Sequence, residues 1–131
     1  DYEKTKDEPA EHGRWGAEIL KEAGLPEEVI RTVQAHNPEA TGIRPESPME
    51  RALYAVDPVS GFIVACALIH PEKKLESLDL SFLLNRFSEK SFARGANREA
   101  MKSIESLGLS LEEFLEIALS AMQTKKEELG L

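Results

Sequence analysis

Three side chains of this 131-residue chain are the candidate metal ligands: His12, His36 and Asp57. Imidazole nitrogen and carboxylate oxygen together suit divalent transition metals such as Mn, Fe, Co, Ni or Zn. A metal held by such groups lowers the pKa of a bound water and polarises a phosphoryl oxygen. The spacing of the three residues matches no short metal-site motif. The residue types therefore suggest a metal site without defining its geometry.

Each of these residues also has an ordinary structural explanation. His12 is expected in the first turn of a helix, where an exposed histidine needs no ligand. His36 is expected at a helix C-terminus, where the helix dipole favours a histidine. Asp57 precedes Pro58, an arrangement typical of a helix end or a turn. Metal binding and a purely structural role both stay open at this level.

A second group of candidate residues is basic. Lys90, Arg94 and Arg98 cluster around Gly95, and such cations bind phosphate. A solvated basic loop explains the same residues, and no phosphate-cradling glycine motif surrounds Gly95. Cys66 lies in an apolar run with no adjacent base, so we expect an inert buried thiol.

The elements that must position these residues are predicted to be helical almost throughout. Ser47 and Glu50 form a capping-box signature for a helix that reaches Asp57 and Pro58, and Ser110 begins another such signature. The other expected helices cover residues 11–23, 26–36, 61–69, 75–87 and 97–108, with a loop at 38–46. The sequence thus predicts one all-α domain over residues 1–131, with residues 124–131 as a frayed tail.

Composition limits the classes of partner. The net charge of −8 argues against a nucleic-acid polymer or an anionic membrane as the main partner. The longest apolar run, residues 62–69, is far shorter than the ~20 residues of a membrane span, so no such span is expected. The single cysteine excludes an intramolecular disulfide and fits a reducing cytoplasm, which is the expected location.

Several short motifs, in this order and spacing, resemble one family. The run Asp1 to Asp7, followed by Glu11-His12-Gly13, is similar to the middle of HD-superfamily hydrolases, in particular a group of small predicted metal-dependent members. The resemblance covers nearly the whole chain. It depends on the order and spacing of the motifs and not on any single motif. Its other segments are residues 16–20, 35–37, 41–42, 55–58, 61–64, 90–93 and 97–99.

The resemblance implies a compact, all-helical, metal-dependent phosphohydrolase acting on a small phosphoester, such as a nucleotide. By position, Asp57 resembles the late metal-binding aspartate of the family. His12 and His36 resemble its intermediate histidines, which bind a second metal or contact the phosphate. The resemblance also implies substrate contacts for Lys90 and Arg98, by their charge and position. The implied cofactor is a divalent metal: Mn, Fe, Mg, Co, Ni or Zn.

The chain departs from the family pattern in its metal ligands. It contains neither the first histidine nor the adjacent His-Asp dyad, so the resemblance assigns no catalytic residue. We therefore expect an N-terminally truncated HD-like bundle with an incomplete site. Apolar surface left on Ile19, Val33 or the 61–69 helix would favour a homo-oligomer. The alternative function is a non-catalytic, acidic helical interaction module.

Overall fold

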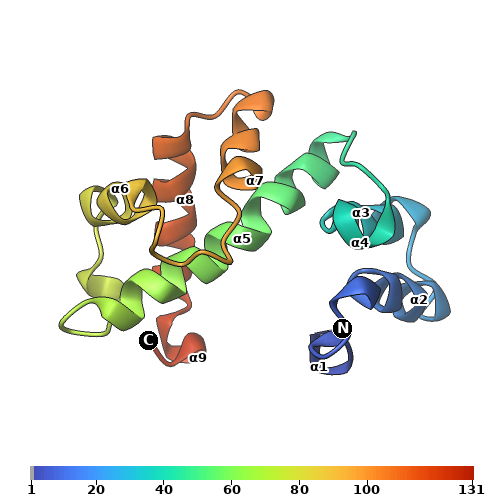
Figure 1. Cartoon of the computed structure of the whole chain (residues 1–131), viewed down its shortest axis with the longest axis horizontal. Helices are drawn as coiled ribbons and strands as arrows, with labels where there is room; N and C mark the ends of the chain where they lie inside the picture. Colours follow the sequence, from blue (N-terminus) through green and yellow to red (C-terminus); the bar gives the residue numbers. More distant parts are fainter. Residues whose placement is uncertain (1) are drawn as a thin grey trace. The chain divides into compact units, whose positions relative to one another are not determined.

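In a computed structural model of the chain, residues 2–131 are described, and Asp1, the first residue of the motif run above, lies outside them. The chain is 70% helical, and residues 2–131 contain no β-strand, which confirms the all-α prediction (Figure 1). Where the sequence predicted one domain, the chain divides into two compact units, Asp1–Tyr54 and Ala55–Leu131.

The first unit is built mainly from two packed helices, α2 and α3, which lie side by side in Figure 1. Their facing sides bury Ala17, Ile30 and Ala35. The remaining elements of this unit are short, apart from the beginning of α5. In order, the unit contains α1 (Tyr2–Thr5), the 3-10 helix η1 (Pro9–Glu11), α2 (Arg14–Glu22), α3 (Glu27–Ala35) and α4 (Pro38–Thr41).

The helix predicted over residues 11–23 is interrupted. Gly13 has a φ of +91°, in the region that L side chains rarely adopt, and it separates η1 from α2. The prediction of an unbroken helix was wrong because the apolar spacing continues across the glycine. The break places His12 in the connection and not in a helical turn.

Helix α5 (Pro48–Ile69) is continuous through Asp57 and Pro58, where two helices were predicted. A proline inside a helix costs about 3 kcal/mol through its missing N–H and its ring clash. Val59, Phe62 and Ile63 follow it and are at most 1% exposed. Burying each such side chain is worth about 1.5–3 kcal/mol, so their packing outweighs the cost of the proline.

Because α5 is continuous, its apolar stretch is longer than the sequence pattern indicated, and its length bears on the question of a membrane span. Within residues 2–131, α5 is the one helix long and apolar enough to cross a membrane by length and composition. The sequence-based expectation had counted only the shorter apolar run at 62–69. One third of the apolar window is buried inside the protein. This finding is weak evidence for a membrane span.

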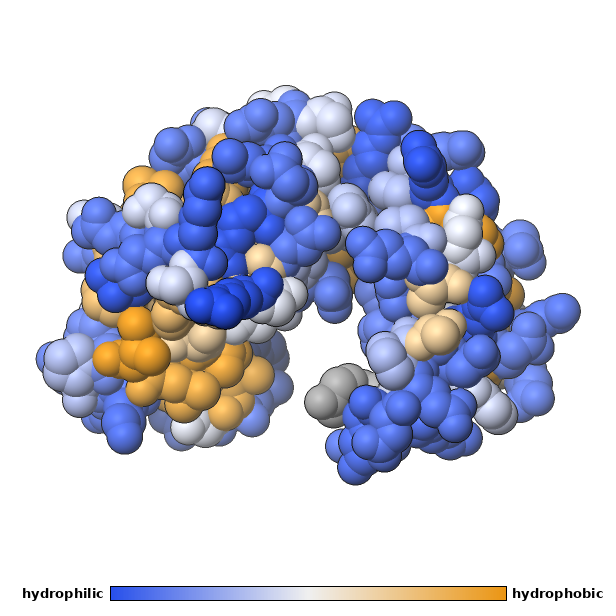
Figure 2. Space-filling view, in the orientation of Figure 1, coloured by the Kyte–Doolittle hydropathy of each residue, from blue (hydrophilic) through white to orange (hydrophobic). Residues whose placement is uncertain are grey.

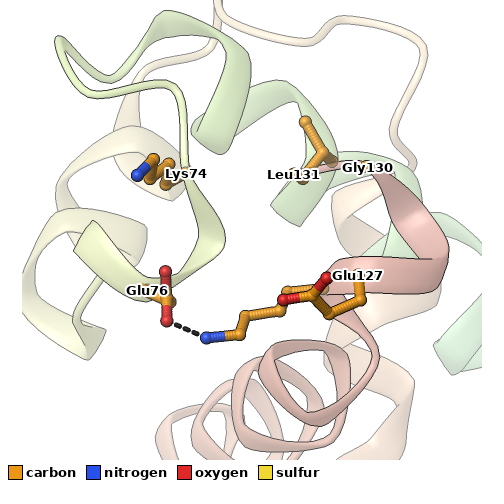
Figure 3. A pocket seen from close by; sticks show the side chains of 6 residues that line it. Lys74, Glu76, Glu127, Gly130 and Leu131 are labelled. Atoms are coloured by element: carbon orange, nitrogen blue, oxygen red, sulfur yellow. Dashed lines mark hydrogen bonds and ion pairs between the residues drawn. The ribbon is translucent and has the colours of Figure 1, made fainter.

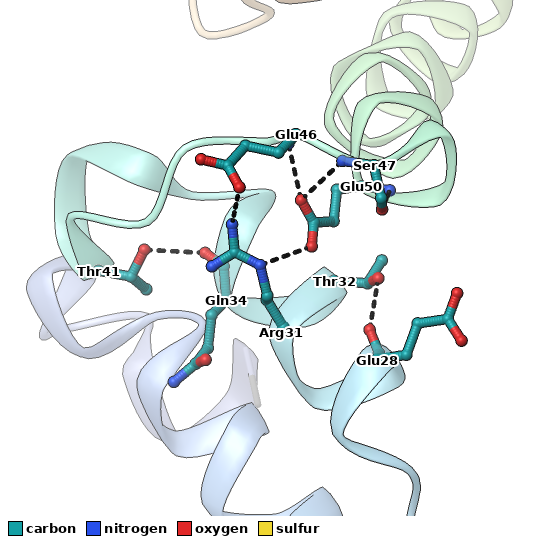
Figure 4. A network of polar contacts seen from close by, with 8 residues as sticks. All are labelled: Glu28, Arg31, Thr32, Gln34, Thr41, Glu46, Ser47 and Glu50. Atoms are coloured by element: carbon teal, nitrogen blue, oxygen red, sulfur yellow. Dashed lines mark hydrogen bonds and ion pairs between the residues drawn. The ribbon is translucent and has the colours of Figure 1, made fainter.

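A polar network fixes the start of α5 (Figure 4). Glu50, which is 3% exposed, accepts hydrogen bonds from the backbone N–H groups of Glu46 (2.7 Å) and Ser47 (3.1 Å). The Glu50 N–H donates to the Ser47 hydroxyl, which confirms the predicted capping box. Arg31 of α3 forms ion pairs with Glu46 and Glu50, both at 2.9 Å. The network therefore ties α3 to the beginning of α5.

The second unit packs its helices around the buried part of α5. Phe62 is fully buried and makes edge contacts with Phe87 and Phe92, with ring centroids 5.9 Å apart in each pair. Asn97 and Ser110 cap the helices that follow them, as predicted. The elements are η2 (Leu75–Ser77), α6 (Leu80–Ser88), α7 (Arg98–Lys102), η3 (Ser103–Leu107), α8 (Leu111–Thr124) and α9 (Lys126–Leu129).

The tail expected to fray from residue 124 contains a short helix, α9. Lys126 of α9 pairs with Glu76 of η2 at the edge of a surface pocket (Figure 3). Leu131 packs against the core of the second unit. The ion pair joins α9 to η2. The contact of Leu131 with the core links residues far apart in the sequence, so the local sequence pattern did not predict it.

The face of the molecule drawn in Figure 2 is mostly hydrophilic. Figure 2 also shows an apolar area over the part of the second unit where α5 ends. Leu68 and Ile69, the last apolar residues of α5, are 54% and 49% exposed. In the first unit, Trp15 and Ile19 are 46% and 42% exposed on α2. The expected exposure of Ile19 is therefore confirmed.

Candidate functional site

Two of the predicted site residues meet in the first unit. His12 follows η1, and His36 ends α3. Their Nε2 atoms are 3.0 Å apart, their ring centroids are 4.9 Å apart, and their planes are nearly perpendicular at 88°. Both side chains are half-buried. The structure thus brings together two imidazoles that are 24 residues apart in the sequence.

The outer nitrogens of this histidine pair are held by oxygen atoms. Nδ1 of His36 contacts the carbonyl oxygen of Val33. A carbonyl only accepts hydrogen bonds, so Nδ1 carries a proton, and in the neutral ring the lone pair is on Nε2. Nδ1 of His12 is 3.4 Å from the hydroxyl oxygen of Thr5, a residue that is 2% exposed. These contacts hold the two rings with their Nε2 atoms 3.0 Å apart.

Two arrangements account for nitrogen atoms 3.0 Å apart. One is an N–H···N hydrogen bond between the two rings. The other is a shared metal ion, because two nitrogens each about 2.0–2.1 Å from a metal lie roughly 2.9–3.4 Å apart at tetrahedral or octahedral angles. The pair therefore fits two adjacent positions around a divalent metal. Among residues 2–131, no group of three or more His, Cys, Asp or Glu side chains has metal-site geometry, so the pair supplies two ligands and not a full set.

The backbone around the pair is tightly packed. A Cβ added to Gly13 would lie 3.3 Å from Cγ2 of Thr41, 3.5 Å from the Val33 oxygen and 3.6 Å from Cε1 of His36. The Asn37 amide donates to the His12 carbonyl at 3.1 Å. The close approach of the two segments thus depends on a glycine beside His12.

A cavity of 520 Å³ lies next to these segments, between η1 and α4. Arg14 lines it and donates two hydrogen bonds to the Ala40 carbonyl, at 3.1 and 2.7 Å. Pro9, Ala10 and Asn37 also line the cavity. It offers an open approach beside the backbone that carries His12 and Asn37.

The other predicted site residues belong to the second unit. Asp57 was expected at the end of a helix, but it lies within α5, and its side chain is exposed. Its carbonyl accepts a hydrogen bond from the Ser60 hydroxyl at 2.9 Å. Lys90 and Arg98 line one cavity in the connection between α6 and α7. The structure therefore pairs His12 with His36 and, separately, Lys90 with Arg98.

Sequence reasoning assigned no role to Thr5 or Gly13. Thr5 was part of the motif run, but nothing in that run indicated a contact with the ring of His12. The Gly13 position offered a signal, because a glycine directly after a candidate ligand often marks a positive φ or a close backbone approach. Cys66 is fully buried as expected, and burial raises the pKa of its thiol to about 12.

Comparison of the chain with protein-family models, with curated proteins and with solved structures found no match. The fold and the site therefore define a class only: an all-helical protein with a histidine pair in its first unit and a basic cavity in its second.

Proposed function

We propose that this chain is a metal-dependent phosphohydrolase of the HD superfamily that acts on a small phosphoester, such as a nucleotide. The observation that carries the proposal is the 3.0 Å separation of the Nε2 atoms of His12 and His36. The sequence resemblance implies metal or phosphate contacts for these same two histidines. The two lines of support come from different kinds of evidence.

The residues of the chain have distinct parts in this proposal. His12 and His36 offer nitrogen ligands, and Val33 keeps the lone pair of His36 directed toward His12. A divalent metal such as Mn, Fe, Mg, Co, Ni or Zn would supply an activated water and polarise a phosphoryl oxygen when bound. Asp57 is proposed as a further ligand by resemblance only, and Lys90 and Arg98 as substrate contacts.

The ligand set is incomplete in the sequence as it stands. The three histidines are followed by glycine, asparagine and proline, so the chain has no adjacent His-Asp dyad. Two nitrogen ligands hold a metal less tightly than a closed site of four ligands does. We therefore propose weak metal binding and low hydrolytic activity for the chain alone, with a second copy of the chain as one source of further ligands.

The test uses the fact that the chain has only three histidines. Substoichiometric Mn²⁺ is added, and the imidazole proton resonances are followed by NMR. We expect paramagnetic broadening of His12 and His36, while His70, which packs edge-on against Phe82 at 5.1 Å, stays sharp. Equal broadening of all three resonances, or of none, would contradict the proposal.

The matched variants are His12→Ala, His36→Ala and the control His70→Ala. The first two should weaken Mn²⁺ affinity by at least about tenfold, since loss of even an outer-shell partner has an effect of that size. His70→Ala should bind as the parent does. Hydrolysis of bis(p-nitrophenyl) phosphate with excess Mn²⁺ should follow the same order, and activity that survives in His36→Ala would contradict the assignment.

The second candidate is a non-catalytic, acidic helical interaction module. The exposed Trp15 and Ile19 on α2, together with the net charge of −8, favour it. It predicts a chain that ignores Mn²⁺ and self-associates or binds a protein through α2. Light scattering of the parent and of Ile19→Glu at several concentrations measures this, and a monomeric parent would count against self-association.

A further inference from the structure

The connection between α6 and α7 lines an open surface cavity of 450 Å³ with an unusual charge. Of the described residues, three cationic side chains line it, those of Lys90, Arg94 and Arg98, and no acidic side chain does. This contrasts with the whole chain, in which 24 acidic residues outnumber 16 basic ones. A local concentration of positive charge in an acidic protein focuses anions on that place.

Arg98 makes this connection rigid. Its guanidinium donates to the carbonyl oxygens of Phe92 (2.8 Å), Ala93 (2.7 Å) and Ala96 (2.9 Å). It also lies over the ring of Phe62, 4.9 Å from the centroid. The loop is therefore shaped before any ligand arrives, which lowers the entropy cost of binding.

The positive charge of the cavity is not neutralised by a nearby carboxylate. Glu89, the acidic residue next to Lys90, forms an ion pair with Arg86 at 2.6 Å. Among the described residues, no ion pair involves Lys90, Arg94 or Arg98. Burial lowers the pKa of Arg98, because desolvation disfavours its charged form, and a bound anion would offset that cost.

Gly95 leaves open space in the lining. Its φ is not positive, so the backbone conformation does not require glycine. A Cβ added there would meet no atom within 4 Å. Neither strain nor close packing inside the protein requires glycine at this position, so the backbone at Gly95 is open to the cavity.

We propose that this cavity binds the phosphoryl group of a small phosphorylated molecule. Lys90 and Arg94 contact the phosphoryl oxygens, Arg98 is a positioning residue that holds the loop, and Gly95 lets the ligand approach the backbone. Phe87, which also lines the cavity, offers an apolar wall for the organic part of the molecule. The inference rests on the proposed function in one respect, namely that the phosphorylated molecule bound here is the substrate of the phosphohydrolase. Binding of the anion itself requires neither a metal nor the histidine pair.

The size and charge of the site favour a small molecule over a nucleic-acid polymer. A cavity of 450 Å³ lies within the roughly 300–1,000 Å³ range of small-molecule pockets. Three cations suffice for one phosphoryl group, whereas a polymer would also face the net charge of −8. Tighter binding of a single-stranded oligonucleotide than of a mononucleotide would overturn the proposal.

The experiment is a titration of the full chain by NMR and calorimetry in EDTA at low ionic strength. The probes are inorganic phosphate and a nucleoside monophosphate. We expect one saturable binding event, with shifts confined to residues around 87–98, and tighter binding of the nucleotide because Phe87 contacts its organic part. Shifts spread over the whole surface would mean non-specific binding and overturn the site.

Lys90→Ala and Arg94→Ala alter exposed side chains, so both variants should fold. Each should weaken binding about tenfold, the effect of losing one charge-assisted contact. Gly95→Val should weaken it by narrowing the cavity. Arg44→Ala, which removes an exposed arginine of the first unit, is the matched control and should bind as the parent does. Equal weakening in Arg44→Ala, or none in Arg94→Ala, would overturn the proposal.

The two proposals fail in different ways. Anion binding in EDTA with no Mn²⁺ binding at the histidine pair would support the cavity and reject the metal-dependent function. Mn²⁺ binding without any anion binding in the cavity would reject the cavity alone.

Discussion

Replacing Glu50 by glutamine tests how much the buried end of the α5 network contributes to the first unit. Glu46 and Glu50 both bind Arg31 at 2.9 Å, but their side chains are 78% and 4% exposed. The two carboxylates thus share a partner and a distance and differ in burial. Glu46→Gln is therefore a matched control for Glu50→Gln.

The expected magnitudes follow from this difference. One Glu50 oxygen accepts two backbone N–H groups, and the other binds Arg31, so a neutral amide cannot replace both. Breaking a fully buried ion pair costs about 3–5 kcal/mol, but Arg31 is 37% exposed and keeps Glu46, so we expect about 2 kcal/mol. For Glu46→Gln we expect at most about 0.5 kcal/mol, as for an exposed ion pair.

The assay is urea unfolding followed by tryptophan fluorescence. Trp15 is the only tryptophan and lies in the first unit, so its signal reports the unit that Glu50 stabilises. Equal losses in Glu46→Gln and Glu50→Gln would refute the role of burial. A loss below about 0.5 kcal/mol in Glu50→Gln would refute the assigned contribution of the network.

The same variant predicts a pH dependence. Hydrogen bonds from the backbone N–H groups of Glu46 and then Ser47, together with Arg31, hold the pKa of Glu50 below its ordinary value of 4.5. The unfolded state therefore binds this proton more readily than the folded state does. The stabilisation of the folded state by ionised Glu50 is complete at pH values above the ordinary pKa of this carboxyl group. It is lost as the pH falls through the pKa that Glu50 has in the folded state. The stability difference between parent and Glu50→Gln should thus shrink in acid, and a constant difference down to pH 3 would contradict this reasoning.

Three further predictions concern other parts of the chain. Gly13→Ala should destabilise the first unit by about 1–2 kcal/mol through its positive φ, and by more than Gly24→Ala, since Gly24 shares the positive φ without neighbours within 4 Å; equal losses would show that crowding is unimportant. The Cys66 thiol, with its pKa near 12, should react with a disulfide reagent at pH 8 at least about a thousandfold more slowly in the folded than in the urea-unfolded chain; comparable rates would contradict its burial. Asn97→Ala should cost about 1 kcal/mol in urea unfolding followed by circular dichroism, while Asn97→Asp keeps the cap; an equal loss in both variants would contradict the capping role.

The features that the sequence predicted correctly depend on interactions between near neighbours. Ser110 and Glu113 are three residues apart and form the capping box that their spacing predicts. Asn97 caps α7 through N–H groups two and three residues later. Such local preferences do not depend on the tertiary fold, so a single sequence suffices to find them.

The features that the sequence did not predict depend on distant contacts. The ring of His12 meets that of His36 because α2 and α3 pack together, and no local pattern encodes that packing. Pro58 lies inside α5 because the burial of Phe62 and its neighbours exceeds the local penalty. The low helical propensity of proline predicts the free-energy cost of Pro58 inside a helix, but it does not predict the core packing that offsets this cost.

Two errors of local interpretation fall in the first unit: the loop predicted at 38–46 contains the short helix α4 (Pro38–Thr41), and the helix predicted over 11–23 is broken at the candidate site. A continuous helix over residues 11–23 satisfies the apolar periodicity, but the chain breaks it at Gly13 and places His12 outside the helix. Departures from local helix preferences are most often found where the resulting geometry serves a function, because an unbroken helix would have the lower free energy. The glycine that breaks the helix is also the residue that lets the His12 segment approach His36, Val33 and Thr41. If Gly13→Ala separates the two imidazoles and abolishes Mn²⁺ broadening while the first unit stays folded, the break exists for the histidine pair; if broadening persists, the break serves packing alone.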